Sequence, residues 1–493
     1  GGDGGRGMVY RRPETYHSNG TGGSNAQGRA INKMLLEVLR DRVIDAHRLD
    51  IAFETYLDRM DCVNLATLLF HTGKKRMVLL PHYVAGVAAR FTQLKEELRA
   101  REASNALYGL KCLSSDIPEV RELVLSLANK LVHSTSDFVA QAVGNALYGL
   151  QMMSSEYEEV RIILSVLAAK VSRCTELLEA QNVGNALYGL RNMSSDHAEV
   201  RAVVAALTPK IAMAREDLNG QALGNSLYGL QSMSSKETEV QYLLTVLATK
   251  VARVWEHLKA QEVGNALYGL KRMSSDVPEV RLLVAALVPK IAASPDFLDA
   301  QAIGNSLFGL QNMSSQHAEV LSLISVLGEK IDLSCPELDG QAMGNSLYGL
   351  QRMSTEHLEV RSLITVLSSK LQASYVHMNA QELAHALVGM QLMTSEHADV
   401  RRLLAALAQK VNLSKHDHPQ SQEIANALHG LQGMSSDNPE TRLLVRCVAQ
   451  KLAGNALDAA GICSCLCGLQ RMSSQSEDVR ALVMSVASRL EGA

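Results

Sequence analysis

Asn145-Ala-Leu-Tyr-Gly-Leu150 is the stretch that decides the fold, because the chain repeats it at a fixed interval. The same six residues, or a close variant, begin at 105, 185, 225, 265, 305 and 345. The period is therefore 40 residues, and decayed copies lie at 67–72, 385–390, 426–431 and 464–469. A period of this length is typical of a repeat array. We count about eleven units between residue 50 and the C-terminus.

One unit, residues 138–177, predicts two helices joined by a short polar turn. Its apolar residues recur at helical spacing in two segments, first at 143, 147, 150 and 153 and then at 160, 164, 167 and 171. Ser154-Ser155-Glu156 separates these segments. We expect helices of about 14 residues each, the first over 139–153. A single hairpin cannot bury its apolar face, but stacked neighbours can, so the predicted fold is an all-α solenoid.

Polar residues around the turn predict helix caps. The Ser-Ser pairs precede each second helix, and Asp116-Ile-Pro-Glu119 has the spacing of a capping box. Lys170 lies in a last helical turn, where a cation suits the helix dipole. Gly144 and Gly149 predict a close approach between successive first helices, because glycine otherwise weakens a helix.

The array has distinct ends. Residues 1–29 are rich in Gly, Ser and Asn and predict a flexible tail. One interpretation of this tail is the remnant of an organelle-targeting segment. Residues 30–100 predict a capping helix at 31–49 and a degenerate repeat. Regular repeats span 101–411, and divergent C-terminal repeats span 412–493, beginning with a longer loop at 412–421.

Composition excludes several classes of protein. The chain has 48 basic and 51 acidic residues, a net charge of −3, so it is no strongly basic nucleic-acid binder. No apolar run reaches membrane-spanning length, and we expect no membrane insertion. The eight cysteines form no disulfide framework, which fits a reducing intracellular compartment. We expect no metal and no cofactor, since Cys463, Cys465 and Cys467 spread around a helix.

A second stripe runs along each first helix, opposite the core. Gln141, Asn145 and Tyr148 lie on this side of the helical wheel, and most units repeat all three residue types. The polar row is Asn105, Asn145, Asn185, Asn225, Asn265, Asn305, Asn345 and Asn426. The aromatic row is Tyr108, Tyr148, Tyr188, Tyr228, Tyr268, Phe308 and Tyr348. These side chains either line a ligand-binding surface or bond between neighbouring repeats.

The last position of this stripe varies from unit to unit. The candidate recognition residues there are Asn192, Ser232, Arg272, Asn312, Arg352 and Arg471. A constant frame with one variable side chain per repeat suits recognition of a linear polymer, although free drift of an exposed position gives the same pattern. The preceding position adds three candidate phosphate ligands, Lys111, Arg191 and Lys271. The Glu and Arg residues that begin each second helix, such as Glu159 and Arg161, predict capping and pairing between repeats instead.

The segment Asp296-Phe-Leu-Asp-Ala-Gln301-Ala-Ile-Gly-Asn305-Ser-Leu-Phe-Gly-Leu310 resembles the octotricopeptide repeat class, which also occurs upstream of RAP domains. Gln141, Asn145, Leu147, Tyr148 and Gly149 match the same pattern, and the resemblance covers most of the chain. It implies a solenoid that binds single-stranded RNA in mitochondria or plastids. The implied roles are RNA processing, stability, translation or ribosome assembly, within a ribonucleoprotein.

Two functions follow as alternatives. In an RNA-binding adaptor the aromatic row would stack bases, the amides would bond base edges and the cations would neutralise phosphates. In a protein-binding scaffold the Asn row, which resembles the Asn ladder of armadillo proteins, would hold an extended peptide or assemble a larger complex. A continuous basic surface over the aromatic row favours RNA, and a neutral or acidic one favours protein.

An enzyme is the least favoured class. His197, His317, His357 and His397 recur in the turn and are interpreted as turn residues, because about one helix diameter separates successive units. The chain shows no nucleotide-binding glycine loop, zinc motif or nucleophile elbow. We therefore expect no catalytic residues.

Overall fold

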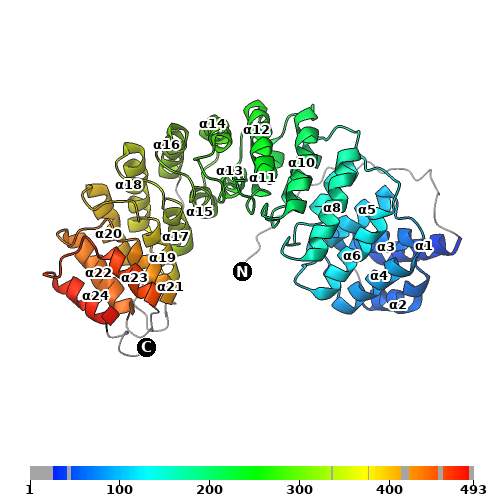
Figure 1. Ribbon diagram of the computed structural model, residues 1–493, viewed down its shortest axis with the longest axis horizontal. Helices are drawn as coiled ribbons and strands as arrows, with labels where there is room; N and C mark the ends of the chain where they lie inside the picture. The colour runs from blue at the N-terminus through cyan, green and yellow to red at the C-terminus, as the bar shows by residue number, and fades with distance from the viewer. Residues whose placement is uncertain are drawn as a thin grey trace.

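Our computed structural model describes residues 26–40, 46–334, 337–375, 377–411, 421–452 and 459–487. Within these ranges the chain forms helices, turns and one isolated bridge between Met378 and Val411, without a strand. Successive helix pairs stack side by side into an arch (Figure 1). The predicted all-α solenoid is confirmed. Most of the predicted tail, up to residue 25, and residues 412–420 of the predicted loop lie outside the described ranges.

The N-terminal end differs from the prediction of one capping helix at 31–49. Two helices, α1 (Ala26–Arg40) and α2 (Ala46–Tyr56), occupy this region, followed by the 3₁₀ turn η1 (Leu57–Arg59). The first of them already begins within the predicted tail. The degenerate copy at 67–72 lies in α3 (Cys62–Lys74), which pairs with α4 (Pro81–Gln93).

Eleven helix pairs, from α3 and α4 to α23 and α24, follow in the described residues. The first helices of the later pairs are α5 (Ala100–Gly109, extended by η2 Leu110–Cys112), α7 (Ala140–Tyr148), α9 (Ala180–Gly189), α11 (Gly220–Tyr228), α13 (Ala260–Tyr268), α15 (Ala300–Phe308), α17 (Gly340–Tyr348), α19 (Ala380–Val388), α21 (Ser421–His429) and α23 (Ala459–Gly468). The second helices are α6 (Pro118–Val132), α8 (Glu158–Arg173), α10 (Ala198–Met213), α12 (Thr238–Arg253), α14 (Pro278–Ala292), α16 (Ala318–Leu333), α18 (Leu358–Ala373), α20 (Ala398–Lys410), α22 (Pro439–Leu452) and α24 (Glu477–Ala487).

The core consists of the two apolar stripes predicted for each unit. Val143, Leu147 and Leu150 of one stripe and Leu164 and Leu167 of the other are at most 1% exposed. The first helices are shorter than predicted, however. Helix α7 has nine residues and ends at Tyr148 instead of near Met153. Tighter bonds, such as Leu150 N–H to Leu147 C=O at 2.9 Å, turn the chain there.

Glycine lets successive first helices touch, as predicted. A Cβ atom on Gly149 would lie 1.9 Å from the carbonyl oxygen of Leu107 in the preceding repeat. Equivalent glycines from Gly189 to Gly468 meet a leucine carbonyl at 1.8–2.0 Å. No side chain fits at this distance, whereas a glycine Cα–H can point at the oxygen as a weak hydrogen bond. The close packing keeps equivalent side chains of neighbouring first helices near one another.

Two polar rows tie the repeats together elsewhere. In the turn, the second serine of one repeat accepts a backbone hydrogen bond from the next repeat, as Ser155 Oγ does from Ser194 N–H at 2.9 Å. At the opposite end of the second helix, Lys170 is 2% exposed and its Nζ donates to the carbonyls of Ser134 and Ser136 in the preceding repeat. Burial lowers the pKa of Lys170. The same lysine recurs at 130, 210, 250, 290, 330, 370 and 410 with an equivalent acceptor.

The capping predictions are partly wrong. Helix α6 begins after Ile117, which forms no side-chain cap, so Asp116 and Glu119 build no capping box. Ser114 Oγ instead accepts the Asp116 N–H at 3.2 Å and closes the turn. The serine pairs thus close one turn and connect it to the next, rather than cap the second helix. Lys170 lies in the last turn of its own helix, as predicted, but it also donates to carbonyls of the segment that follows α6 in the preceding repeat.

Candidate functional site

In the C-terminal half of the arch, the first helices from α13 to α19 lie on its inner side and the second helices on its outer side (Figure 1). Each first helix packs on the next, which continues this side of the array back to α5. We call the solvent-facing side of α5 to α19 the inner surface. The core stripe of each first helix faces the second helices, and its glycines face the neighbouring repeat. The opposite stripe therefore faces solvent along the inner surface through its Gln and Asn residues, whereas Tyr108 and Tyr148 are only 7% exposed.

Two rows of side-chain amides run along the inner surface, and we call them the amide rows. The Gln row is exposed and the Asn row is half-buried. None of these fourteen amides has a hydrogen-bond partner within the described part of the chain, so the alternative that the Asn residues bond between repeats is wrong in this structure. The rows are Gln141, Gln181, Gln221, Gln261, Gln301, Gln341 and Gln381, and Asn105, Asn145, Asn185, Asn225, Asn265, Asn305 and Asn345. Asn426 lies further along, exposed on α21.

The helices that carry these rows are almost free of charge. From α7 to α17, Glu262 is the one charged residue in the first helices. The residues just before these helices are exposed and include Glu179, Asp299 and Asp339 against Lys259. From α7 to α17 the inner surface is therefore amide-lined and uncharged except for Glu262, with a mainly acidic border on the side of the loops that join repeats.

The aromatic row packs on itself. From Tyr108 to Tyr348, neighbouring ring centroids lie 5.5–5.8 Å apart at interplanar angles of 18–26°. Phe70 continues the row at one end and His385 at the other. Each ring is thus covered on both faces by the rings of adjacent repeats. The predicted stacking of bases on Tyr148, Tyr188, Tyr228, Tyr268 and Phe308 has no free ring face in this structure.

The three candidate phosphate ligands lie over this aromatic row. Lys111 Nζ is 4.5 Å from the Tyr108 ring centroid and donates to its hydroxyl at 3.0 Å. Arg191 and Lys271 contact Tyr188 and Tyr268 in the same way, with their cations 4.8 and 4.4 Å from the ring centroids. Burial lowers the pKa of Lys271, and the nearby Arg272 lowers it further. These cations border the amide rows on the turn side without forming a continuous basic surface.

The side chains at the variable position, such as Asn192 and Ser232, form hydrogen bonds between neighbouring repeats. In five repeats the side chain at this position donates a hydrogen bond to a backbone carbonyl in the turn that follows the first helix of the preceding repeat. The donor and acceptor pairs are Asn192 and Gln151 (2.9 Å), Ser232 and Arg191 (2.7 Å), Arg272 and Ser232 (3.0 Å), Asn312 and Lys271 (2.7 Å), and Arg352 and Asn312 (2.9 Å). Asn, Ser and Arg are interchangeable here because each supplies a donor. This explains the variation without recognition of bases.

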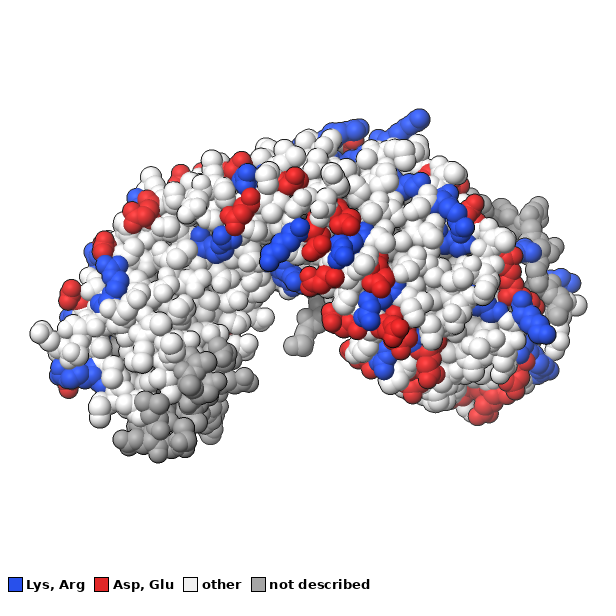
Figure 2. Space-filling view, viewed as in Figure 1, with Lys and Arg blue, Asp and Glu red and all other residues white. Residues whose placement is uncertain are grey.

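The arginines at this position also reach acids two repeats earlier. Arg272 pairs with Asp196 at 3.7 Å, Arg352 with Asp276 at 3.1 Å and Arg471 with Glu396 at 2.8 Å. Bonds from Arg352, His317 and Ser274 lower the pKa of Asp276. Basic and acidic side chains accordingly lie close together on the face of the arch that Figure 2 shows.

The remaining charged residues of the turn behave as predicted. His197 and His317 contact turn acids of the preceding repeat, with Nε2 3.4 Å from Glu156 and 3.3 Å from Asp276. Arg161 Nη1 donates to the Ser155 carbonyl at 2.8 Å, which caps its own turn. Equivalent arginines also reach glutamates of the next repeat. These residues are engaged in the fold, whereas the amide rows have no partner in the described part of the chain.

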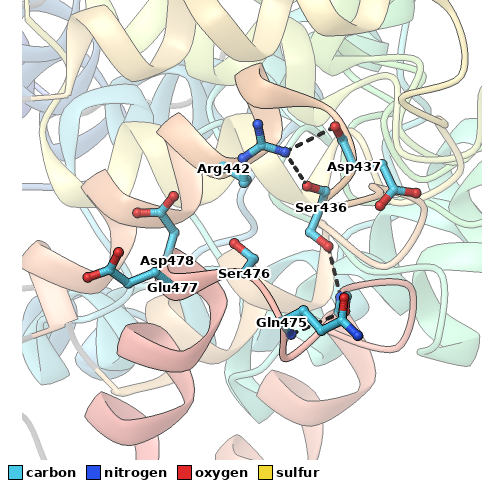
Figure 3. A pocket seen from close by; sticks show the side chains of 8 residues that line it. Ser436, Asp437, Arg442, Gln475, Ser476, Glu477 and Asp478 are labelled. Atoms are coloured by element: carbon cyan, nitrogen blue, oxygen red, sulfur yellow. Dashed lines mark hydrogen bonds between the residues drawn. The ribbon is translucent and has the colours of Figure 1, made fainter.

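A shallow pocket of about 460 Å³ lies at the turns of the last two repeats (Figure 3). Its lining residues are Ser436, Asp437, Arg442, Ser473, Gln475, Ser476, Glu477 and Asp478. Ser476 stands where earlier repeats have a longer side chain such as His397. Arg442 already donates to the carbonyls of Ser436 and Asp437, at 2.7 and 3.0 Å. The described residues contain no cluster of three potential metal ligands, and none of their helices is long and apolar enough to cross a membrane.

No family model matches the chain. No curated protein matches it either. Among solved structures, a homology model of the full-length AP-3 complex in an intermediate open conformation shares 12% identity at a TM-score of 0.36, covering 94% of this chain and 81% of the other. The pentatricopeptide repeat protein PPR10, in complex with an 18-nt psaJ RNA element, shares 11% identity at a TM-score of 0.25. This match covers 94% of this chain and 73% of the other. Neither likeness identifies what this chain binds, and membership of the octotricopeptide class stays a prediction.

Proposed function

We propose that the protein is a non-catalytic helical-repeat adaptor that holds an extended chain molecule along its inner surface. The observation that carries this proposal is the pair of amide rows, fourteen solvent-facing amides without a partner in the described residues. An identical group in successive repeats suits a ligand that itself repeats along its length, which is a linear polymer. A solenoid of this kind acts by bringing its ligand to other subunits of a complex.

The proposal is tested by removing part of the Asn row. Asn185→Ala, Asn225→Ala and Asn265→Ala together delete three amides from the middle of the inner surface. The matched control is Asn129→Ala, Gln372→Ala and Gln409→Ala, which deletes three exposed amides from second helices. Recovery of bound protein and RNA from the native cells should fall about tenfold or more with the inner variant and stay at the wild-type level with the control. Equal recovery by both variants would contradict the proposal.

Single-stranded RNA is the second candidate ligand, and one observation favours it. Lys111, Arg191 and Lys271 border the amide rows at intervals of two repeats, where they could meet successive phosphates. The variant with Gln at all three positions tests this, because Gln151 and Gln231 already stand there in the intervening repeats. RNA binding should weaken and its salt dependence should fall by roughly 2 in log–log slope. Unchanged RNA affinity would remove this candidate.

The cellular location of the protein depends on whether single-stranded RNA is its ligand. If the protein is an RNA adaptor of the class it resembles, it belongs in mitochondria or plastids, in RNA processing, stability, translation or ribosome assembly. Imaging of the full native protein with a C-terminal tag tests this. Exclusion from both organelles would leave the adaptor proposal intact and remove the organelle role.

A further inference from the structure

We infer that the chain held on the inner surface is an extended polypeptide, and that the amide rows bind its main chain. The inference rests on the proposed adaptor function and specifies its ligand. It depends on three observations: the constancy of the amides, the charge of the inner surface and the spacing of the repeats.

The first argument is chemical complementarity. Each Asn or Gln side chain offers N–H donors and a carbonyl acceptor, which match the C=O and N–H of a peptide unit. Because Gln and Asn recur unchanged from α7 to α17, they suit the part of a ligand that is the same at every unit. In a polypeptide that part is the main chain, which extended-peptide binders hold in the same manner. In RNA it is the phosphodiester and the ribose, whose anionic phosphate oxygens only accept hydrogen bonds, so that the 2′-hydroxyl is the one group able to donate to the amide carbonyls.

The second argument is charge. Single-stranded RNA binding depends on cations that neutralise phosphates. The first helices from α7 to α17 supply none, and their one charged residue, Glu262, is an acid. The cations of the turn side contact the aromatic row or the acids Asp196, Asp276 and Glu396. A neutral main chain meets no electrostatic penalty on this surface.

The third argument is geometry. Equivalent rings of neighbouring repeats, one turn from the Asn row, lie 5.5–5.8 Å apart. Two residues of an extended strand span about 6.6 Å and one residue only about 3.3 Å. Each repeat therefore corresponds to two residues of the ligand, and the seven Asn residues of the row correspond to about 14.

If the amide rows bind the main chain, the protein should select little among peptides of different sequence. Five side chains at the variable position, Ser232 and Asn312 among them, already donate to backbone carbonyls of the array. They are not free to select ligand side chains. The protein should accept many extended segments, provided that their main-chain N–H groups are intact, and its affinity should depend little on salt.

The experiment uses the full chain and two random libraries, one of peptides of about 14 residues and one of RNAs of about 14 nucleotides. The best peptide is compared with a scrambled version and with a version N-methylated at alternate residues, in registers that start at the first and at the second residue. N-methylation removes main-chain donors and leaves every side chain in place. Affinity is measured with the wild type, the inner triple Asn variant and the outer control variant, from about 50 to about 500 mM salt.

The expected result is a peptide whose scrambled version binds within about threefold, while one N-methylated register and the inner variant each lose about tenfold or more. Salt should change the affinity less than about threefold. Peptide binding that survives N-methylation or the inner variant overturns the inference. Recovery of RNA alone, with its binding lost in the inner variant, overturns it as well but leaves the adaptor function standing. Absence of a binder from both libraries also contradicts it.

Discussion

Glycine at the end of each first helix is the residue on which close stacking depends. A Cβ on Gly229 would lie 2.0 Å from the Leu187 carbonyl oxygen, and a backbone atom cannot move aside as a flexible side chain can. Gly229→Ala should therefore destabilise the protein by about 1–3 kcal/mol or more, as overpacking does. Thermal or denaturant unfolding of the purified protein measures the change.

Gly328 provides the matched control for this prediction. It lies inside α16, and a Cβ there would meet its nearest neighbour, Leu363 Cα, at 4.0 Å, an ordinary contact. Ala168, Ala248 and Ala408 stand at the same place in other repeats. Gly328→Ala should stabilise the helix by about 0.5–1 kcal/mol. A loss of stability as large as that of Gly229→Ala would show that added volume in general, not the carbonyl contact, is harmful.

Residue roles were predictable where one residue type meets a local need. The helical spacing of Val143, Leu147 and Leu150 marked the core, and Gly149 marked the close approach. The role of Lys170 and its equivalents was only partly predictable. The carbonyls to which Lys170 donates lie in the preceding repeat, and the sequence alone does not indicate that contact. The recognition role predicted for Asn192 and Arg272 rested on the change of residue type from repeat to repeat. The same change is expected when any side chain with a hydrogen-bond donor meets the need of the fold.

The aromatic row connects the first helices of successive repeats, since each ring contacts the rings of the repeats before and after it. Tyr228 stacks on Tyr188 and on Tyr268, each at 5.6 Å between centroids. Tyr228→Phe should leave stability nearly unchanged, because Phe308 already takes this place in another repeat. Tyr228→Ala removes both contacts and should cost roughly 2–4 kcal/mol. Equal melting temperatures for the two variants would contradict a structural role for the rings.

The ion pairs of the turns connect helices two repeats apart and should depend on pH. Bonds from Arg352 and other residues hold the pKa of Asp276 below its usual value, so this stabilisation is present above about pH 4. It is lost as pH falls through the lowered pKa of the folded state. Arg352→Gln keeps a donor for the Asn312 carbonyl but removes the charge.

The difference in unfolding free energy between wild type and Arg352→Gln should be below about 1 kcal/mol at pH 7, because both side chains are well exposed. It should decrease as the pH falls below about 4 through the lowered pKa of Asp276, and it should vanish in about 1 M salt. A difference that stays constant with pH would mean that Arg352 acts through packing rather than charge. Helix lengths were only partly predictable, since the apolar stripe continues past Tyr148 although the helix does not.

At the scale of the whole molecule, the period of 40 residues was sufficient to predict an all-α solenoid. The same spacing placed Gln, Asn and Tyr on one surface. It did not show that Asn145 faces solvent without a partner while Tyr148 is covered by its neighbours, because both outcomes fit one helical stripe. Charge was least predictable, since Arg272 and Asp196 meet only through the stacking of repeats.

The most direct test of the central claim asks what touches the inner surface in the cell. A photo-crosslinking amino acid is placed at Gln221, on α11, and in a second protein at Asn129, on the outer helix α6. We predict that the inner position crosslinks to an extended polypeptide segment, identified by mass spectrometry, and that the outer position does not crosslink to it. Crosslinks to the same partner from Asn129 but not from Gln221 would contradict the account. Crosslinks from Gln221 to RNA would keep the surface and change the ligand.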